Sequence, residues 1–180
     1  LIWYILIYMR IKLRKYSREP QGFTLVELLV VIGIIGILST MAVVSLNSAR
    51  GKARDAKRVY DVKQLQTALE LYFEDQGSYP ITSGTITLGA GTNCNTHACT
   101  CLDASGFTDS CTPQNAYMAQ VPTAPTVPAG DAYTYRSSGI GNNYVISLNL
   151  EGSAGNLVAG LVCAMPYGLS SAGGATCLAP

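Results

Sequence analysis

The 180-residue sequence has little of what catalysis and nucleic-acid binding require. It holds one histidine, His97, and contains no phosphate-binding loop and no serine–histidine–acid pattern. Beyond Lys63 the only basic residue is Arg136, against seven acidic residues. A lone histidine among scattered acids argues against an enzyme. The acidic C-terminal part makes nucleic acid an unlikely partner, because basic side chains supply most of the affinity for a phosphate backbone.

Proline is absent from residues 23–46, and charge is almost absent, since Glu27 is the only charged side chain there. At about 1.5 Å per residue, a helix of this length reaches about 36 Å, enough to cross a hydrocarbon core of about 30 Å. Basic residues flank the stretch, with Arg18 before it and Arg50 and Lys52 after it. We therefore predict a membrane-spanning helix, in which the carboxylate of Glu27 needs an explanation.

A basic leader precedes the span, with five basic residues in residues 1–22 against one acidic residue, Glu19. The positive-inside rule predicts that the leader stays in the cytoplasm and that the C-terminal part lies outside. An ordinary secretory signal is cut after its apolar region at a small-residue site, and no such site follows this span, so processing would have to precede it. Met9 opens the basic segment, and we expect translation to start there, with residues 1–8 an upstream extension. A start at another codon or a truncated record is the alternative.

The stretch Gly22-Phe23-Thr24-Leu25-Val26-Glu27 resembles the class III signal of type IV prepilins and pseudopilins, with a basic leader before it and an apolar span after it. The resemblance implies cleavage between Gly22 and Phe23 by a prepilin peptidase of the inner membrane. It also implies that the same enzyme methylates the new amino group of Phe23. The likeness continues more weakly to about Pro80.

The resemblance also implies a role for Glu27 in assembly. A carboxylate inside a membrane helix is costly unless it is paired. Cleavage creates an ammonium group at Phe23, so that in a filament the ammonium of a neighbouring subunit can neutralise Glu27 and set the axial register, as a buried polar residue does in a coiled coil. The alternative is a carboxylate near enough to the membrane edge to stay hydrated.

Beyond the span the helical pattern continues. Apolar side chains recur at spacings of three and four, as at Val62, Leu65, Leu69 and Tyr72. Gly77 and Pro80 form a strong stop signal, so we predict one helix from about Thr24 to about Gln76. We interpret the basic run in residues 50–63 as a solvated face near lipid headgroups. The ending resembles the Gly-x-Tyr-Pro turn of G-type pseudopilins, in which Tyr79 caps the junction between helix and domain.

Six cysteines all follow the span, which indicates an oxidising compartment. Cys163 and Cys177 enclose a Gly/Ser-rich loop, and we favour a disulfide between them. The remaining four, which allow three pairings that we leave open, are Cys94, Cys99, Cys101 and Cys111. Cys99 and Cys101 are too close in sequence to pair easily with each other. The spacing around His97 invites a zinc site, but it fits no standard zinc pattern, so we predict no metal.

No cofactor is expected. Residues 121–128 lie where G-type pseudopilins carry an acidic loop and, nearby, a calcium site. Ala124 stands where an acidic residue would be expected, and Asp131 alone cannot coordinate calcium. The analogy with the family therefore suggests calcium, but the residues present do not support it.

The clearest strand is residues 144–150, where Tyr144, Ile146, Leu148 and Leu150 alternate with more polar residues. With residues 133–137 before it and residues 157–163 after it, it predicts an antiparallel meander on the helix. We expect an α+β, type IV pilin-like fold. Its expected parts are a leader (1–22), a membrane half of the helix (23–46), an amphipathic half (47–76), a cysteine-containing variable loop region (77–130) and a meander with a C-terminal disulfide loop (131–180).

The sequence is compatible with three functions. The leading hypothesis is a structural subunit that polymerises into a type IV pilus or a type II secretion pseudopilus. The resemblance implies as partners the chain itself, the prepilin peptidase, an assembly platform protein with a cytoplasmic ATPase, and the inner membrane, with the filament periplasmic or extracellular. The alternatives are a monomeric binding module tethered to the membrane and a minor tip pilin for adhesion or DNA uptake. The Gly-x-Tyr-Pro turn favours secretion, whereas the cysteine-rich insert and the missing acidic loop favour a pilus.

Overall fold

The computed structural model describes residues 22–89, 94, 98–112, 114–126, 132–173 and 176–177. The chain divides into two compact units, Leu1–Val44 and Ser45–Pro180. The single helix α2, Leu25–Gln76, begins in the first unit and ends in the second. This helix confirms the one that the sequence predicts from about Thr24 to about Gln76.

The described part of the first unit runs from Gly22 to Val44 and contains the apolar part of α2. Every side chain described there is exposed. An 18-residue window of α2 has a mean hydropathy of 2.6, and none of that window is buried. By length and composition the helix is able to cross a membrane.

The helix ends where the sequence provides a stop. Gly77 adopts a φ of 72°, and its N–H donates to the carbonyl oxygen of Phe73 at 2.8 Å. A left-handed residue that closes the last turn in this way is the common C-terminal cap, and glycine adopts that conformation without strain.

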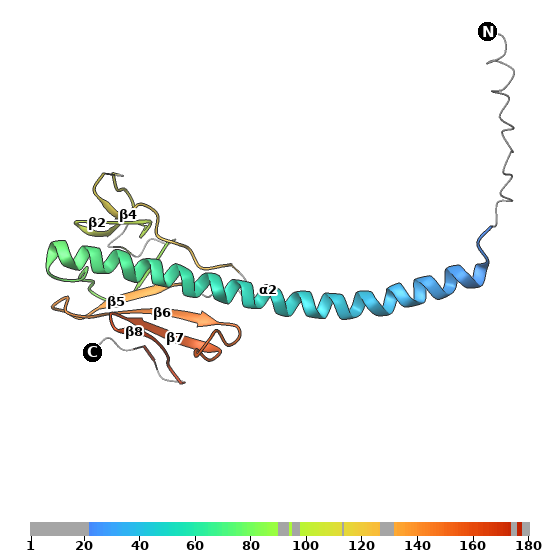
Figure 1. Cartoon of the computed structure of the whole chain (residues 1–180). Helices are drawn as coiled ribbons and strands as arrows, with labels where there is room; N and C mark the ends of the chain where they lie inside the picture. The colour runs from blue at the N-terminus through green and yellow to red at the C-terminus, as the bar shows by residue number, and fades with distance from the viewer. Residues whose placement is uncertain are drawn as a thin grey trace, which may run out of the picture. The chain divides into compact units, whose positions relative to one another are not determined.

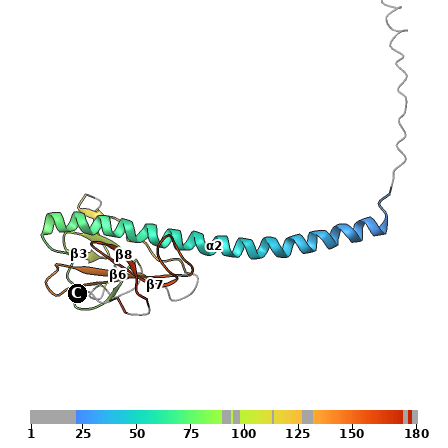
Figure 2. The ribbon, with the colours of Figure 1, turned by 60° about the horizontal axis from the view of Figure 1, so that its bottom comes forward.

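The second unit contains two antiparallel sheets (Figure 1). The five-stranded sheet, in spatial order, is β1 (Ile86–Thr87), β5 (Thr134–Ser137), β6 (Tyr144–Leu150), β7 (Gly160–Met165) and β8 (Gly168–Ser171). The three-stranded sheet, in spatial order, is β3 (Gly106–Thr108), β2 (Cys101–Asp103) and β4 (Ala116–Met118). Figure 1 shows the larger sheet along one side of the C-terminal part of α2, with β2 and β4 along the other side, and Figure 2 shows β3, β6, β7 and β8 below the helix.

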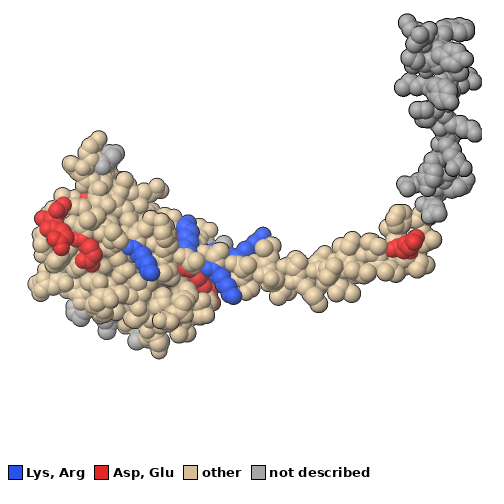
Figure 3. All heavy atoms as spheres, viewed as in Figure 1, with Lys and Arg blue, Asp and Glu red and all other residues tan. Residues whose placement is uncertain are grey.

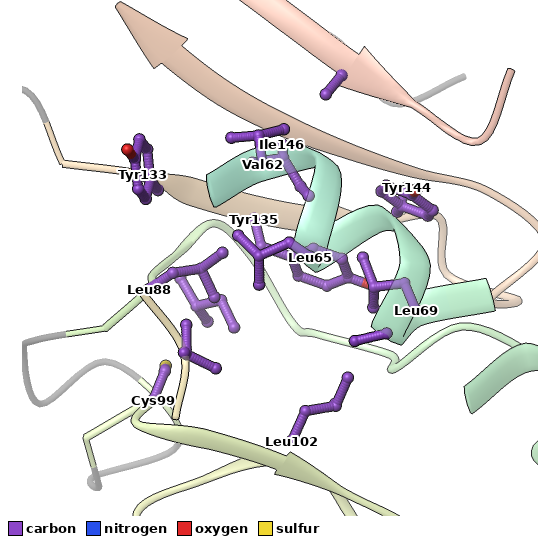
Figure 4. Close-up of a cluster of buried hydrophobic side chains, with 14 of the residues drawn as sticks. Val62, Leu65, Leu69, Leu88, Cys99, Leu102, Tyr133, Tyr135, Tyr144 and Ile146 are labelled. Carbon is purple, nitrogen blue, oxygen red and sulfur yellow. The ribbon is translucent and has the colours of Figure 1, made fainter. Parts of the chain in front are cut away.

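The core lies where α2 meets the sheets (Figure 4). Val62, Leu65 and Leu69 of the helix are fully buried, as are Tyr135 and Ile146 of the larger sheet. Each such aliphatic side chain contributes about 1.5–3 kcal/mol by leaving water. This packing confirms the α+β, pilin-like fold that the sequence predicts.

Strand β6 shows both the strength and the limit of the alternation pattern. Tyr144, Ile146, Leu148 and Leu150 are all buried toward the helix, as predicted. Val145, on the opposite face, is also only 2% exposed. It lies on the face of the sheet that carries Cys163, because Cys163 pairs in register with Ser147 two residues further along β6.

Several elements differ from the prediction. The cysteine-containing region, expected as a variable loop region over residues 77–130, contains β1 and the whole three-stranded sheet. Its strands have two or three residues each, too few to show a period of two. The strand expected over residues 157–163 lies at Gly160–Met165, and β8, rich in glycine and serine, was not expected.

Candidate processing and assembly site

The N-terminus of α2 begins with a reciprocal cap. Thr24 precedes the first helical residue, and its hydroxyl oxygen accepts the backbone N–H of Glu27 at 3.2 Å. The Oε2 of Glu27 accepts the backbone N–H of Thr24 at 2.9 Å and its hydroxyl at 2.7 Å. Threonine at the N-cap and glutamate three residues later form a capping box, which satisfies N–H groups that the helix itself leaves unpaired.

Glu27 therefore has a partner within its own chain, which neither interpretation of the sequence included. The signal was present, because Thr-x-x-Glu before an apolar run is the capping-box pattern. Among the described residues, Oε1 accepts no hydrogen bond, so half of the carboxylate is available to a second donor. The cap does not remove the cost of a negative charge at membrane depth.

The predicted scissile bond joins two exposed, non-helical residues, Gly22 and Phe23. The Phe23 side chain is 85% exposed. A methyl group added at Gly22 would have no atom within 4 Å, and the backbone there does not need a left-handed φ. The fold of the described residues thus does not require glycine at position 22.

A second polar cluster lies in the Ser45–Pro180 unit, where α2 meets the turn after β6. The guanidinium of Arg58 donates to Asp55 Oδ1 at 2.9 Å and to Glu151 Oε1 at 2.8 Å. Arg54 Nε donates to the same Glu151 oxygen at 2.7 Å. Asp55 in turn accepts the backbone N–H groups of Glu151 and Gly152 at 2.9 and 2.7 Å. The charge-assisted hydrogen bonds that join Arg54, Arg58 and Asp55 to Glu151 and Gly152 tie the helix to the turn after β6.

This cluster corrects the interpretation of residues 50–63 as a solvated face only in part, since Arg50, Lys52, Lys57 and Lys63 are exposed as expected. Arg58 and Asp55 are 0% and 2% exposed, and Asp61 is 5% exposed while it accepts the hydroxyl of Tyr133 at 2.9 Å. The sequence contained a signal, because Asp55, Arg58 and Asp61 follow a spacing of three on the arc that continues into Val62. Charged residues on the apolar arc of a helix indicate buried partners rather than solvent.

The electrostatics follow from these contacts. Hydrogen bonds from Arg54, and then from Arg58, lower the pKa of Glu151 to about 2. Burial raises the pKa of Tyr133 far above its usual value, and the hydrogen bond to Asp61 raises it further. A shallow cavity of about 320 Å³ adjoins the cluster and is lined in part by Ser48, Lys52 and Ser153. Arginines and backbone N–H groups already occupy its two carboxylates.

Tyr79 has the structural position that the family resemblance suggests. Its side chain is buried, its hydroxyl donates to Glu70 at 3.0 Å, and its ring packs against Phe73 and Tyr144. Burial, together with the hydrogen bond to Glu70, raises its pKa to about 12. The tyrosine thus closes the junction between the helix and the strands.

All six cysteines are paired in the structure. The disulfides are Cys94–Cys99, Cys101–Cys111 and Cys163–Cys177. The last is the pair that the sequence favours, and the first two are one of the three pairings left open. The described residues contain no group of three or more histidine, cysteine or acidic side chains arranged for a metal ion. His97 and Asp131, considered for zinc and calcium, lie outside the described residues.

Comparison with known proteins gives a consistent set of relatives. Residues 18–43 match the family described as the prokaryotic N-terminal methylation motif. The type II secretion system core protein G of Aeromonas hydrophila is 34% identical over 140 residues, which cover 77% of this chain and 89% of that protein. The proteins of the same name from Vibrio cholerae and Escherichia coli are 41% and 43% identical over 68 and 65 residues, 47% and 45% of their own length. No solved structure matches the chain significantly.

Proposed function

Since this chain belongs to the family of the type II secretion system core protein G, we propose that it is a pseudopilin, a structural subunit cleaved at Gly22 that polymerises into a pseudopilus. The observation that carries the proposal is the geometry of the N-terminus. An exposed, non-helical Gly22–Phe23 bond stands directly before a capped helix whose apolar side chains within residues 25–44 are all exposed. Exposed apolar side chains of this extent need lipid or neighbouring copies to cover them.

Cleavage between Gly22 and Phe23 is supported by the accessibility of the bond. A peptidase must reach the bond in extended backbone, and neither residue is helical or buried. The glycine has no structural reason within the described residues, so recognition by the processing enzyme is the explanation we favour. The same enzyme would then methylate the amino group of Phe23.

Glu27 supplies the assembly contact in this proposal. Its Oε2 holds the cap, and its Oε1 is left to accept the Phe23 ammonium of a neighbouring subunit. In a low-dielectric environment pairing with an ammonium group is favoured, because an unpaired carboxylate there is costly. One carboxylate thereby caps its own helix and fixes the register of the next copy.

The proposed location follows from the same elements. The apolar part of α2 anchors the subunit in the inner membrane, with the leader in the cytoplasm and the disulfide-bonded domain outside. From there the subunits enter a periplasmic filament, driven by an assembly platform protein and a cytoplasmic ATPase. The names of the relatives favour secretion over a surface pilus, and a structural role rather than an enzymatic one.

The decisive experiment is Glu27→Gln in the full chain, expressed with the prepilin peptidase and the secretion assembly proteins. Glutamine at this position retains the capping box, so helix initiation is preserved while the charge is lost. We expect the variant to insert into the membrane and to be cleaved, but to form no filaments by electron microscopy of sheared material. Glu27→Ala, which also removes the cap, should be no better than Glu27→Gln.

Two outcomes would contradict the proposal. If Glu27→Gln forms filaments as the native chain does, the carboxylate serves the cap and not an intermolecular pair. If the native chain, once cleaved, remains monomeric in the membrane, the tethered binding module becomes the better description. Cleavage itself is read by mass spectrometry, which should find an N-terminal methylated Phe23.

A further inference from the structure

The outward face of the C-terminal part of α2 separates its charges by sign. This charged face consists of the exposed side chains of Lys52, Lys57, Lys63, Glu70, Glu74 and Asp75. At about 100° per residue all six project away from the arc that buries Val62 and Leu65. Figure 3 shows acidic side chains gathered at one end of the domain and basic side chains toward the other.

Apart from Glu70, which accepts the hydroxyl of Tyr79, these side chains make no hydrogen bond or ion pair with the described residues of their own chain. Among the described residues, none of Lys57, Lys63, Glu74 and Asp75 takes part in an ion pair, whereas Arg54 and Arg58 do. The acidic end also occupies the last turn of α2, where no basic residue stands. Carboxylates are unfavourable there, because the C-terminal end of a helix carries partial negative charge. An unfavourable and unpartnered arrangement points to a partner outside the chain.

We propose that the charged face of α2 is a self-complementary contact, in which the basic end of one copy binds the acidic end of a second copy. The inference rests on the proposed function, since it requires subunits that polymerise. All copies enter the membrane in the same direction, so neighbouring helices are parallel. Parallel copies in register would oppose like charges, whereas a shift of about 20 Å along the helix places lysines beside carboxylates.

The arrangement favours a filament over a closed dimer. The two ends of the charged face are different surfaces. When two copies bind, the first still has a free acidic end and the second still has a free basic end, so each can bind a further copy. Tyr60 and Leu71 lie on the same face, 62% and 53% exposed, and would add apolar contact area between the charged ends.

This contact is separate from the pairing of Glu27 with a neighbour's Phe23. Those two residues are four positions apart, a shift of about 6 Å along a helix. Because the two shifts differ, the charged face would join each copy to a different neighbour in a helical polymer. The charged face would therefore join subunits of the filament that the pairing of Glu27 with Phe23 does not join.

Crosslinking of native filaments tests the contact without any substitution. A carbodiimide joins a lysine amine directly to a carboxylate that it touches. We expect linked peptides that join Lys57 or Lys63 to Glu74 or Asp75. Within one helix the nearest such pair is 11 residues apart, about 16 Å, so a link of this kind must come from two copies. Filaments without any such link would overturn the proposal.

Charge reversal in the full chain gives the second test. Lys57→Glu with Lys63→Glu, or Glu74→Lys with Asp75→Lys, should each reduce sheared filament by about tenfold or more, since like charges then meet. All four reversals together restore complementarity and should recover filaments. Arg136→Glu, an exposed reversal on β5, is the matched control and should leave the yield unchanged.

The outcomes separate this inference from the proposed function. If the native chain is cleaved and forms no filaments, the proposed function fails. If the native chain forms filaments and the two-residue reversals do so equally well, or the fourfold variant does not recover, the charged face is not the contact. The crosslink decides for any variant that fails to fold, since it uses the native chain.

Discussion

Arg58 and Glu151 stand 93 residues apart in the chain, yet Arg58 Nη1 lies 2.8 Å from Glu151 Oε1, with the Arg58 side chain fully buried. Asp55, one helical turn earlier, meets the same guanidinium and accepts the backbone N–H groups of Glu151 and Gly152. The relationship locks α2 to the turn that follows β6. A buried cation holding two carboxylates is costly to disrupt from one side, because each partner is then left without compensation.

The first prediction is that Arg58→Met destabilises the domain by about 3–5 kcal/mol, since a buried carboxylate, Asp55, loses its cation. Methionine fills a similar apolar volume, so the effect reports charge more than packing. The free energy of unfolding is measured by urea titration of the detergent-solubilised chain, followed by near-ultraviolet circular dichroism of the tyrosines. Lys57→Met, an exposed neighbour on the same helix, should change it by no more than about 0.5 kcal/mol. Equal effects for the two variants would show that Arg58 is not held as described.

The second prediction concerns the stability of the domain at low pH. The folded pKa of Glu151 is about 2, below its ordinary value of 4.5, because Arg54 and Arg58 favour the ionised carboxylate. Its contribution to stability is therefore fully present above about pH 4.5 and is lost as the pH falls toward about 2. Glu151→Gln should lower stability at neutral pH and flatten its fall in that acid range. Urea midpoints measured across the range test this, and an unchanged acid slope in the variant would contradict it.

The elements predicted correctly are those whose signal is local. The helix has a repeating apolar spacing through Leu65 and Leu69 and a glycine stop at Gly77, and strand β6 has seven residues over which to alternate. The motif from Gly22 to Glu27 is likewise contiguous. Each of these patterns is readable because the residues that define it are neighbours in the chain.

The elements that were missed depend on partners far away in sequence. The strands of the small sheet are three residues long, and Leu102 is fully buried as part of the core cluster that also contains Leu65 and Leu69 of α2. The burial of Arg58 depends on Glu151, which no local pattern connects to it. Short strands and long-range ion pairs are decided by tertiary packing, which outweighs local propensity.

The third prediction concerns the C-terminal disulfide. Cys163 on β7 is bonded to Cys177, 14 residues on, and the bond holds the end of the chain against the larger sheet. In the chain-entropy model, closing a loop of about this length stabilises the folded state by about 3 kcal/mol. Replacing both cysteines with serine should lower the free energy of unfolding by about that amount. We expect the helix–sheet core of the variant to keep its packing. Loss of the near-ultraviolet circular dichroism signal, which would indicate a molten domain, would contradict the prediction.

The last prediction isolates a single backbone conformation. Gly77 has a φ of 72°, and a methyl group added there would meet no atom within 4 Å, so in the folded state Gly77→Ala changes backbone strain without any steric clash. A residue with a Cβ in the left-handed region costs about 1–2 kcal/mol, which should appear as a loss in the free energy of unfolding. Gly84→Ala is the matched control, since its added methyl also meets nothing and its backbone needs no left-handed φ. The control should be neutral or slightly stabilising, because alanine narrows the unfolded ensemble. If the two variants behaved alike, the cap at Gly77 would not be what ends the helix, and the turn through Tyr79 would have to do so alone.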